Sequence, residues 1–285
     1  MTGTATRVAA DPDVMAVTDG PVPERLDGGT HSGPLDSAAP GRYLLRFPGV
    51  GRFLVQGTVG GGALVTVERS PAATDTDVTW LLAGPVRQVC WLLRGRFALR
   101  GCGIVVDGRA VALTGLAASG KSTVAAALAR RGHGLLADGA LPIGLDPGPA
   151  AGPADGHVQL WPDMAGRLGF DGQDGEPVRA GLAKRRHRFG TALAAPLAAI
   201  VVLQRGAGVD PLVTQPATGW DAAGALVAHT AMQPVIGALG CAPRHFQWCT
   251  RLAVEARVVH LRFDRHHGDP HAVADAVERL SARGP

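Results

Sequence analysis

A nine-residue segment near the middle of the chain carries the residue types that bind phosphate groups. It reads Gly115-Leu-Ala-Ala-Ser-Gly-Lys-Ser-Thr123 and matches G-x-x-x-x-G-K-[ST] at every required position. Glycines let such a loop curl until successive backbone N–H groups point at phosphate oxygens. The alternative is a chance match in a chain with 40 glycines. The positions expected to contact the phosphates are Gly115, Ala117, Ala118, Ser119, Gly120, Lys121, Ser122 and Thr123.

Two side chains of this segment have distinct expected roles. Lys121 would place a compact positive charge between the β- and γ-phosphates of a nucleotide, and the hydroxyl of Ser122 is the expected Mg²⁺ ligand. The chain contains only two lysines, Lys121 and Lys184, against 26 arginines. A lysine at this point of the loop indicates a role that the planar guanidinium group of arginine does not fill.

The elements on either side of the segment fit the same interpretation. Residues 109–114 are typical of a strand, and residues 123–131 are typical of a helix that Gly132 closes. Asp107-Gly108 joins the strand to a preceding one over residues 97–106, because this dipeptide favours a tight hairpin turn. A hairpin directly before the loop differs from the alternating strand and helix order of most parallel-sheet nucleotide-binding proteins.

A carboxylate follows the loop helix at the end of a short apolar run. Residues 134–138 predict a strand that ends at Asp138. An acidic side chain at the end of a buried strand beside a phosphate loop is suited to hold a metal ion or to accept a proton. The alternative is an Asp that only forms a turn before Gly139.

The chain divides into three predicted parts. Residues 1–40 are rich in Gly, Pro, Asp, Ser and Thr and predict a disordered leader. Residues 41–85 hold three β-type runs between glycine-rich turns and predict a small antiparallel β-rich subdomain. No helix pattern follows those turns, so they are interpreted as ordinary turns rather than a second phosphate loop. Residues 86–285 form the predicted domain that carries the loop, beginning with a short helix over residues 86–93.

The region after the carboxylate predicts a long connection followed by regular elements. Residues 144–180 are rich in Gly, Pro and Asp and predict a partly mobile segment with an ordered part at 158–163. Histidines at 266, 267 and 271 are either solvated or a metal site, although no spaced ligand pattern accompanies them. The later expected elements are strands over 198–203 and 258–263, helices over 221–232 and 243–256, and a final helix that opens at Asp269-Pro270.

Charge and cysteine content restrict the class of protein. The net charge is +4, and the single dense basic run, Lys184-Arg-Arg-His-Arg188, falls short of the basic stripe of a general nucleic-acid binder. The four cysteines lack C-x-x-C spacing, which indicates reduced thiols. No signal-peptide pattern and no apolar run of about 18 residues occurs. We therefore expect a soluble, cytoplasmic protein that binds neither nucleic acid nor membranes, and we leave its oligomeric state open.

Residues 100–123 and the run Arg131-Gly-His-Gly-Leu-Leu-Ala-Asp138 resemble the catalytic domain of HPr kinase/phosphorylase. The shared order is a hairpin, a phosphate loop, a helix, an R-G-H segment and a short strand that ends in Asp. From Arg42 onward the layout is similar to shorter HPr-kinase-like proteins, including lasso-peptide kinases. The resemblance implies an α/β, mixed-sheet P-loop kinase domain related to phosphoenolpyruvate carboxykinase. It also implies ATP and Mg²⁺ as cofactors and transfer to a serine hydroxyl.

The resemblance implies roles for individual residues. Ser122 and Asp138 would hold Mg²⁺, and Asp138 would match the first of the family's paired aspartates, which acts on the acceptor hydroxyl. Arg186 lies where the family carries basic residues, and it would either stabilise the transferred phosphoryl group or dock an acidic acceptor. The alternative is a solvated basic turn.

Two departures from the family pattern matter for the chemistry. Gly139 stands where the family usually has a second Asp, and Arg100 stands where it usually has His. A missing carboxylate removes charge that would hold a metal ion, and an arginine does not act as a base. The resemblance also leaves out the N-terminal domain of the bifunctional enzyme, and with it the usual reason to expect HPr as the substrate.

The sequence favours one function and leaves others open. The leading hypothesis is an ATP-dependent kinase that phosphorylates a serine-type hydroxyl on a peptide, a protein or a small molecule, with Lys121, Asp138 and Arg186 in the chemistry. The first alternative is a catalytically degenerate accessory protein that only binds nucleotide. The second is a simple NTPase, or a different phosphotransfer or decarboxylation reaction on the same scaffold.

Overall fold

The computed structural model describes most of the chain as two compact units. The described residues are 15–27, 29–31, 37–39, 41–57, 62–171, 175–179, 181–206, 212–264 and 269–282. The first unit takes the chain up to Phe97 together with Met232–Phe246, and the second takes Ala98–Ala231 and Gln247–Pro285. Both units combine helices with sheets, and the strand pairs are both parallel and antiparallel, so the mixed α/β class expected from the sequence is confirmed.

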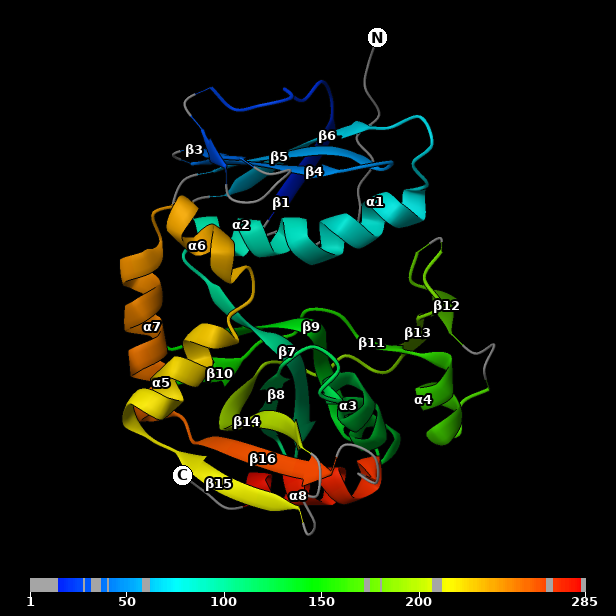
Figure 1. Ribbon diagram of the computed structural model, residues 1–285, viewed down its shortest axis with the longest axis vertical. Helices are drawn as coiled ribbons and strands as arrows, with labels where there is room; N and C mark the ends of the chain where they lie inside the picture. The colour runs from blue at the N-terminus through cyan, green and yellow to red at the C-terminus, as the bar shows by residue number, and fades with distance from the viewer. Residues whose placement is uncertain are drawn as a thin grey trace. The chain divides into compact units, whose positions relative to one another are not determined.

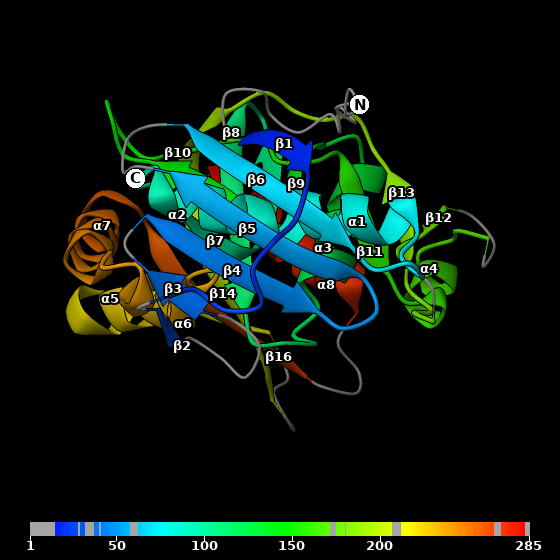
Figure 2. The same cartoon turned by 90° about the horizontal axis from the view of Figure 1, so that it is seen from above.

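The first unit is built on a six-stranded sheet, which Figure 2 shows face-on. Its strand order is β1-β6-β5-β4-β3-β2, and β1 pairs with β6 in parallel while the other pairs are antiparallel. The three central strands contribute buried residues such as Tyr43, Phe53 and Val65. The strands are β1 (Met15–Asp19), β2 (Thr30–His31), β3 (Ser37–Ala39), β4 (Arg42–Phe47), β5 (Gly51–Gly57) and β6 (Ala63–Arg69).

A run of helices follows β6 in the first unit (Figure 1). It consists of α1 (Asp75–Leu81), a π-helical turn (Leu82–Val86) and α2 (Arg87–Leu93), and its apolar residues are buried. Thr74 caps α1, because its hydroxyl accepts the Asp77 N–H while the Asp77 carboxylate accepts from Thr74. Helix α6 (Gln233–Ala238) completes the unit.

The second unit is built on a seven-stranded sheet of order β10-β9-β7-β8-β14-β16-β15. The hairpin of β7 (Phe97–Val106) and β8 (Arg109–Gly115) turns at Asp107-Gly108, as predicted. Strand β14 (Ala195–Gly206) runs parallel to β8 on one side and to β16 (Val258–Asp264) on the other. The carboxyl ends of β8, β14 and β16 therefore meet at one edge of the sheet, which is where α/β proteins place ligands.

Helices and a small sheet complete the second unit. Helices α3 (Lys121–Arg130) and α8 (Pro270–Ala282) share one buried apolar core with the central strands. A three-stranded sheet pairs β13 (Arg185–Arg188) with β11 (His157–Leu160) and β12 (Glu176–Pro177). The remaining elements are β9 (Gly134–Gly144), β10 (Ala150–Ala151), α4 (Pro162–Arg167), β15 (Val213–Ala217) and α5 (Gly219–Ala228), and α7 (Ala242–Glu255) begins in the first unit and ends in the second.

The structure differs from the sequence-based expectations in three places. Strand β1 lies within the expected leader 1–40, because its backbone pairs with β6, a contact that local composition does not reveal. The first unit runs to Phe97 and adds residues 232–246, whereas the sequence placed a boundary at residue 85. The segment 144–180 contains four short regular elements, β10, β11, α4 and β12, which pair or pack within the second unit.

Candidate functional site

A cavity of about 730 Å³ lies in the second unit beside the loop that joins β8 to α3. The loop contributes Ala117, Ala118 and Gly120, and the first turn of α3 contributes Lys121 to Val124. Two walls flank this helix end. One wall contains Arg205 and Phe263 from the ends of β14 and β16, with Pro270 and Val273 from α8. The other wall contains Asp138, Gly139, Gln159, Leu160, Trp161, Asp163, Met164, Arg167 and Lys184, and Arg100 also lines the cavity.

The backbone of the loop needs glycine at its first and last positions. Gly115 has a φ of 140°, and a Cβ there would lie 2.5 Å from the Leu203 carbonyl oxygen of β14 and 2.9 Å from the Ser119 Oγ. Gly120 precedes α3 with a φ of 94°, which is also in the left-handed region. These conformations give the loop a tight curl against β14 and leave the N-terminal N–H groups of α3 to face the cavity. Such an arrangement is suited to an anion.

Lys121 lies over this loop. Its Nζ donates hydrogen bonds to the carbonyl oxygens of Gly115 at 3.1 Å and Leu116 at 2.7 Å, and to the Ser119 Oγ at 3.3 Å. Burial lowers the pKa of Lys121, and the nearby charges of Arg100 and Lys184 lower it further, while Asp138 opposes the shift. The half-buried ammonium group is therefore held by neutral oxygens, and a bound phosphate would supply the anion that it lacks.

Asp138 faces the first turn of α3 from β9. Its Oδ1 accepts hydrogen bonds from the Ser122 hydroxyl at 2.9 Å and the Cys102 thiol at 3.0 Å, and its Oδ2 accepts from the Gln159 backbone N–H at 2.8 Å. The sequence predicted a strand that ends at Asp138, but β9 continues to Gly144, so this residue lies within the strand. Burial raises the pKa of the Cys102 thiol, and Asp138 raises it further, so the thiol stays protonated and acts as a donor.

The Ser122 and Asp138 pair fits a Mg²⁺ ion. A hydroxyl and a carboxylate, 2.9 Å apart at the mouth of a phosphate-type loop, are the hard oxygen ligands that this ion prefers, and Mg²⁺ usually completes its shell with waters and substrate phosphates. Within the part of the chain that the structure describes, no group of three or more His, Cys, Asp or Glu side chains lies together as a metal cluster. His266 and His267 lie outside the described residues.

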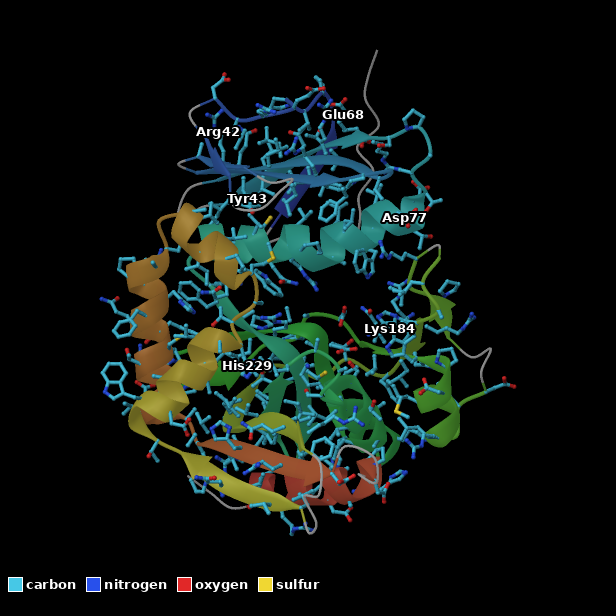
Figure 3. The ribbon with its side chains drawn as sticks, viewed as in Figure 1. Arg42, Tyr43, Glu68, Asp77, Lys184 and His229 are labelled. Carbon is cyan, nitrogen blue, oxygen red and sulfur yellow. The ribbon has the colours of Figure 1, made fainter. Side chains whose placement is uncertain are left out.

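Trp161 and Lys184 stand on the wall that contains Asp138. Lys184, labelled in Figure 3, precedes β13, and its Nζ lies 5.5 Å from the centre of the Trp161 ring. Trp161 follows β11 and has 47% of its surface exposed, although Pro162 fixes the start of α4 directly after it. An exposed indole with an ammonium group over its face is a cation–π pair, and it offers a flat surface next to a positive charge.

Arg100 and Arg205 add two further positive charges. The Nη1 of Arg205 donates to the Ala118 carbonyl oxygen of the loop at 3.0 Å. Arg100 lies on β7, its backbone N–H donates to the His229 carbonyl oxygen at 2.7 Å, and the residue lines the cavity. Burial lowers the pKa of His229, and the charges of Arg100 and Lys121 lower it further, so this buried imidazole is neutral at pH 7.

Arg186 occupies a different setting from the one expected. Its Nη2 pairs with the Glu176 carboxylate at 2.9 Å, across the β12 and β13 ladder, and it is not among the described residues that line the cavity. Of the basic run 184–188, Lys184 lines the cavity instead. The structure thus brings Gly120, Lys121, Ser122, Thr123 and Asp138 together.

Sequence reasoning missed several residues of the site. Cys102 and the Gln159 N–H lie 36 and 21 positions from Asp138, and no local pattern links them. Two others left a signal. Arg205 follows the apolar run 198–203, whose parallel pairing with β8 brings its carboxyl end to the loop. Trp161 lies within the segment 158–163 that was already expected to be ordered.

Comparisons with known proteins give a distant likeness to a solved structure. No family model matches the chain, and no curated protein matches it. Among solved structures, the HPr(Ser) kinase/phosphatase of Coxiella burnetii matches with 14% sequence identity and a TM-score of 0.34, over 64% of this chain and 92% of that chain. None of the four cysteines forms a disulfide, and all four are buried. None of the described helices has the length and apolar character needed to cross a membrane.

Proposed function

We infer that the cavity binds Mg²⁺-ATP and that the protein transfers the γ-phosphoryl group to a serine-type hydroxyl on a peptide, a protein or a small molecule. A single observation carries this inference. The Asp138 carboxylate accepts a hydrogen bond from the Ser122 hydroxyl, at 2.9 Å, directly after a glycine-constrained loop with the G-x-x-x-x-G-K-S pattern. One carboxylate beside a phosphate loop, in a cavity with room for a nucleotide, is the minimum that phosphoryl transfer requires.

Each residue has a chemical task in this proposal. The loop N–H groups and Lys121 would bind the β- and γ-phosphates and balance the charge that develops on the oxygen between them. Asp138 would orient the acceptor hydroxyl and accept its proton. Phe263, Pro270 and Val273 would give the apolar part of the nucleotide a surface. Ser122 and Asp138 would hold Mg²⁺, which neutralises phosphate charge when bound.

Arg186 keeps only an indirect place in the proposal. Its salt bridge to Glu176 stabilises the β12 and β13 pair, which positions the strand that Lys184 precedes. Of the basic run 184–188, the charge that lines the cavity from this wall belongs to Lys184. This assignment differs from the sequence-based prediction only in which residue of the run 184–188 reaches the cavity.

A second candidate is an accessory protein that binds ATP without transferring phosphate. Both oxygens of Asp138 are already engaged by Ser122, Cys102 and the Gln159 N–H, and Gly139 supplies no second carboxylate. A carboxylate whose two oxygens already accept three hydrogen bonds would have to give up at least one of them to orient an acceptor hydroxyl. Under this candidate, nucleotide affinity would not depend on the charge of Asp138.

Transfer of label from [γ-³²P]ATP separates the two candidates. Wild-type protein, Lys121→Ala and Asp138→Asn would be incubated with serine-containing peptides and a pool of small hydroxyl compounds. We expect labelled product with wild type, a loss of about 10²- to 10³-fold in Lys121→Ala and a loss of at least about 10²-fold in Asp138→Asn. Arg188→Gln, on the exposed end of β13, serves as the matched control.

A different set of results would favour the accessory protein over the kinase. Binding of ATP with no label in any acceptor, together with equal nucleotide affinity in wild type and Asp138→Asn, would favour the accessory protein. Thermal melting of each variant would show whether a loss reflects chemistry or folding, because Asp138→Asn also disturbs the three hydrogen bonds to this side chain.

A further inference from the structure

The cavity carries more positive charge than a nucleotide neutralises. Among the described residues that line it, five are cationic (Arg100, Lys121, Arg167, Lys184 and Arg205) and two are acidic (Asp138 and Asp163). Mg²⁺-ATP brings about two net negative charges, so one positive charge is left over. We assign the surplus positive charge to Arg100 and Lys184, because Lys121 and Arg205 donate hydrogen bonds to the loop and these two residues do not.

Neither of these two cations has a carboxylate partner among the residues that the structure describes. Within the described ranges, no Asp or Glu oxygen lies within 4.0 Å of a side-chain nitrogen of Arg100 or Lys184, whereas Arg52, Arg69, Arg131 and Arg251 all form salt bridges. Both charges are close enough to Lys121 to lower its pKa. Like charges that crowd a cavity without a partner are destabilising until an anion binds between them.

The wall around Asp138 also supplies a flat apolar surface. Trp161 presents an exposed indole to the cavity, and Lys184 lies over that ring. Asp138 lies on the same wall, since the Gln159 N–H that binds it belongs to the strand that leads into Trp161. A molecule beside this wall would therefore meet a base, a flat ring and the Lys184 cation, with Arg100 elsewhere in the lining of the same cavity.

We propose that the phosphoryl acceptor is itself an anion: a small hydroxyl compound that carries a carboxylate or a phosphate group. Lys184 and Arg100 bind the anionic group, Trp161 packs against the carbon skeleton, and the hydroxyl faces Asp138. The proposal rests on the proposed kinase function and deepens it, because it selects charged small molecules from the wider class of hydroxyl acceptors.

The reaction balances without another reactant. The acceptor oxygen forms a bond to the γ-phosphorus, and the bond between this phosphorus and the β–γ bridging oxygen breaks. The bridging oxygen leaves as part of ADP, and the hydroxyl proton passes to Asp138 and then to water. The product carries at least one more negative charge than the acceptor, so a cationic wall stabilises the product side as well.

Binding to nucleotide-loaded protein tests the proposal without relying on turnover. Mg²⁺-AMP-PNP is titrated first by calorimetry, and the loaded protein is then titrated with D-glycerate, glycerol 3-phosphate and neutral glycerol. Because AMP-PNP fills the loop, an added anion reports on the opposite wall. We expect both anions, or one of them, to bind at least about 10-fold more tightly than glycerol, and the comparison of the two distinguishes a carboxylate from a phosphate site.

Variants assign the binding to the wall. Lys184→Gln and Arg100→Gln are each expected to raise the Kd of the anion about 10-fold, which exceeds their effect on the Kd of AMP-PNP. Trp161→Ala is expected to raise the Kd of the anion more than the Kd of AMP-PNP. The matched control is Arg188→Gln, which removes an exposed charge of the same strand and is expected to leave both constants unchanged.

Failure of this inference differs from failure of the proposed function. If AMP-PNP does not bind, the nucleotide function itself is wrong. If AMP-PNP binds but no anion does, if glycerol binds as tightly as the anions, or if the three wall variants change only the AMP-PNP constant, then the kinase proposal stands and the anionic acceptor is wrong. The last of these results would assign Trp161 and Lys184 to the nucleotide.

Discussion

Two glycine-rich turns in this chain lie beside cavities that contain cationic side chains, yet they differ in how those charges are balanced. In the first unit, Gly49-Val-Gly51 joins β4 to β5 next to a cavity of about 550 Å³ lined by Arg46, Arg52 and Arg69. Arg52 pairs with Glu68 at 2.6 Å and with Glu24, and Arg69 pairs with Asp19 and Asp75. These salt bridges balance the charge of the pocket from within.

The loop of the second unit leaves its charge without a counter-ion. Lys121 is held by carbonyl and hydroxyl oxygens, and Lys184 lies over an indole ring. The turn at Gly49 connects two antiparallel strands, whereas the loop at Gly115 opens onto the N-terminus of a helix. The two turns therefore share glycine and positive charge, but they differ in whether salt bridges balance that charge and in whether a helix N-terminus follows. A helix N-terminus is the setting that favours an anion.

Substituting one glycine in each turn is expected to give the largest contrast. Gly115→Ala would force a methyl group to within 2.5 Å of the Leu203 carbonyl oxygen, while Gly49 has a φ of 79° and open space within 4 Å of the point where a Cβ would lie. We expect Gly115→Ala to cost about 3 kcal/mol of unfolding free energy and to abolish AMP-PNP binding, and Gly49→Ala to cost about 1 kcal/mol. Calorimetric melting and nucleotide titration measure the two effects.

The same two variants define the result that would break the contrast. If Gly49→Ala weakens AMP-PNP binding as strongly as Gly115→Ala at a temperature where both are folded, the two turns do not differ in function. If neither substitution changes binding, the tight curl of the loop against β14 is not required for nucleotide binding.

Removing one arginine from each region gives an intermediate contrast. Arg205 donates to the Ala118 carbonyl oxygen and lines the cavity proposed to bind the nucleotide, so Arg205→Gln is expected to raise the Kd of Mg²⁺-AMP-PNP about 10-fold. Arg52→Gln removes a charge that Glu68 already balances and is expected to leave this Kd unchanged. Titration at low and high salt provides the check, because only the wild-type and Arg52→Gln proteins should show the full salt dependence.

Much of the scaffold around the loop follows from local sequence signals. The β7 and β8 hairpin, α3, β14, α7, β16 and α8 were predicted to within a few residues, because each combines strong periodicity with a clear turn or cap. Helix α1 was missed although Thr74 and Asp77 form a capping box, since the helix is only seven residues long. Strands β1 and β15 were missed because both depend on pairing with β6 and β16.

The residues of the candidate site that are adjacent in the sequence could be predicted, but those that the fold brings together from distant positions could not. The run from Gly115 to Thr123 and Asp138 were predicted from the residues and a family resemblance. The structure places Ala117, Ala118, Gly120 to Thr123 and Asp138 in the lining of one cavity. The sequence favoured Arg186, whereas Lys184 lines the cavity. Distinguishing the two would have required the register of β13, because its pairing with β11 and β12 decides which residue of the run reaches the cavity. Cys102 is brought to Asp138 by long-range strand pairing.

The smallest expected contrast is the dependence on pH that Glu68 gives to the stability of the first unit. The Val22 backbone N–H donates to Glu68, labelled in Figure 3, at 2.6 Å, and this bond together with the Arg52 guanidinium lowers the pKa of Glu68 from its ordinary value of 4.5. A carboxyl group whose pKa is lower in the folded state stabilises the protein fully when the pH is above the pKa of the unfolded state. This stabilisation is lost as the pH falls through the pKa of the folded state.

Glu68→Gln keeps an oxygen that can accept the Val22 N–H but removes the charge that pairs with Arg52. We therefore expect the variant to melt slightly below wild type at pH 7, and this difference to shrink as the pH falls below 4.5. A difference that stays constant from pH 7 to pH 3 would mean that Glu68 acts through packing rather than charge. At pH 7 the affinity for AMP-PNP should be the same in both proteins, because Glu68 lines the pocket whose charges are already paired.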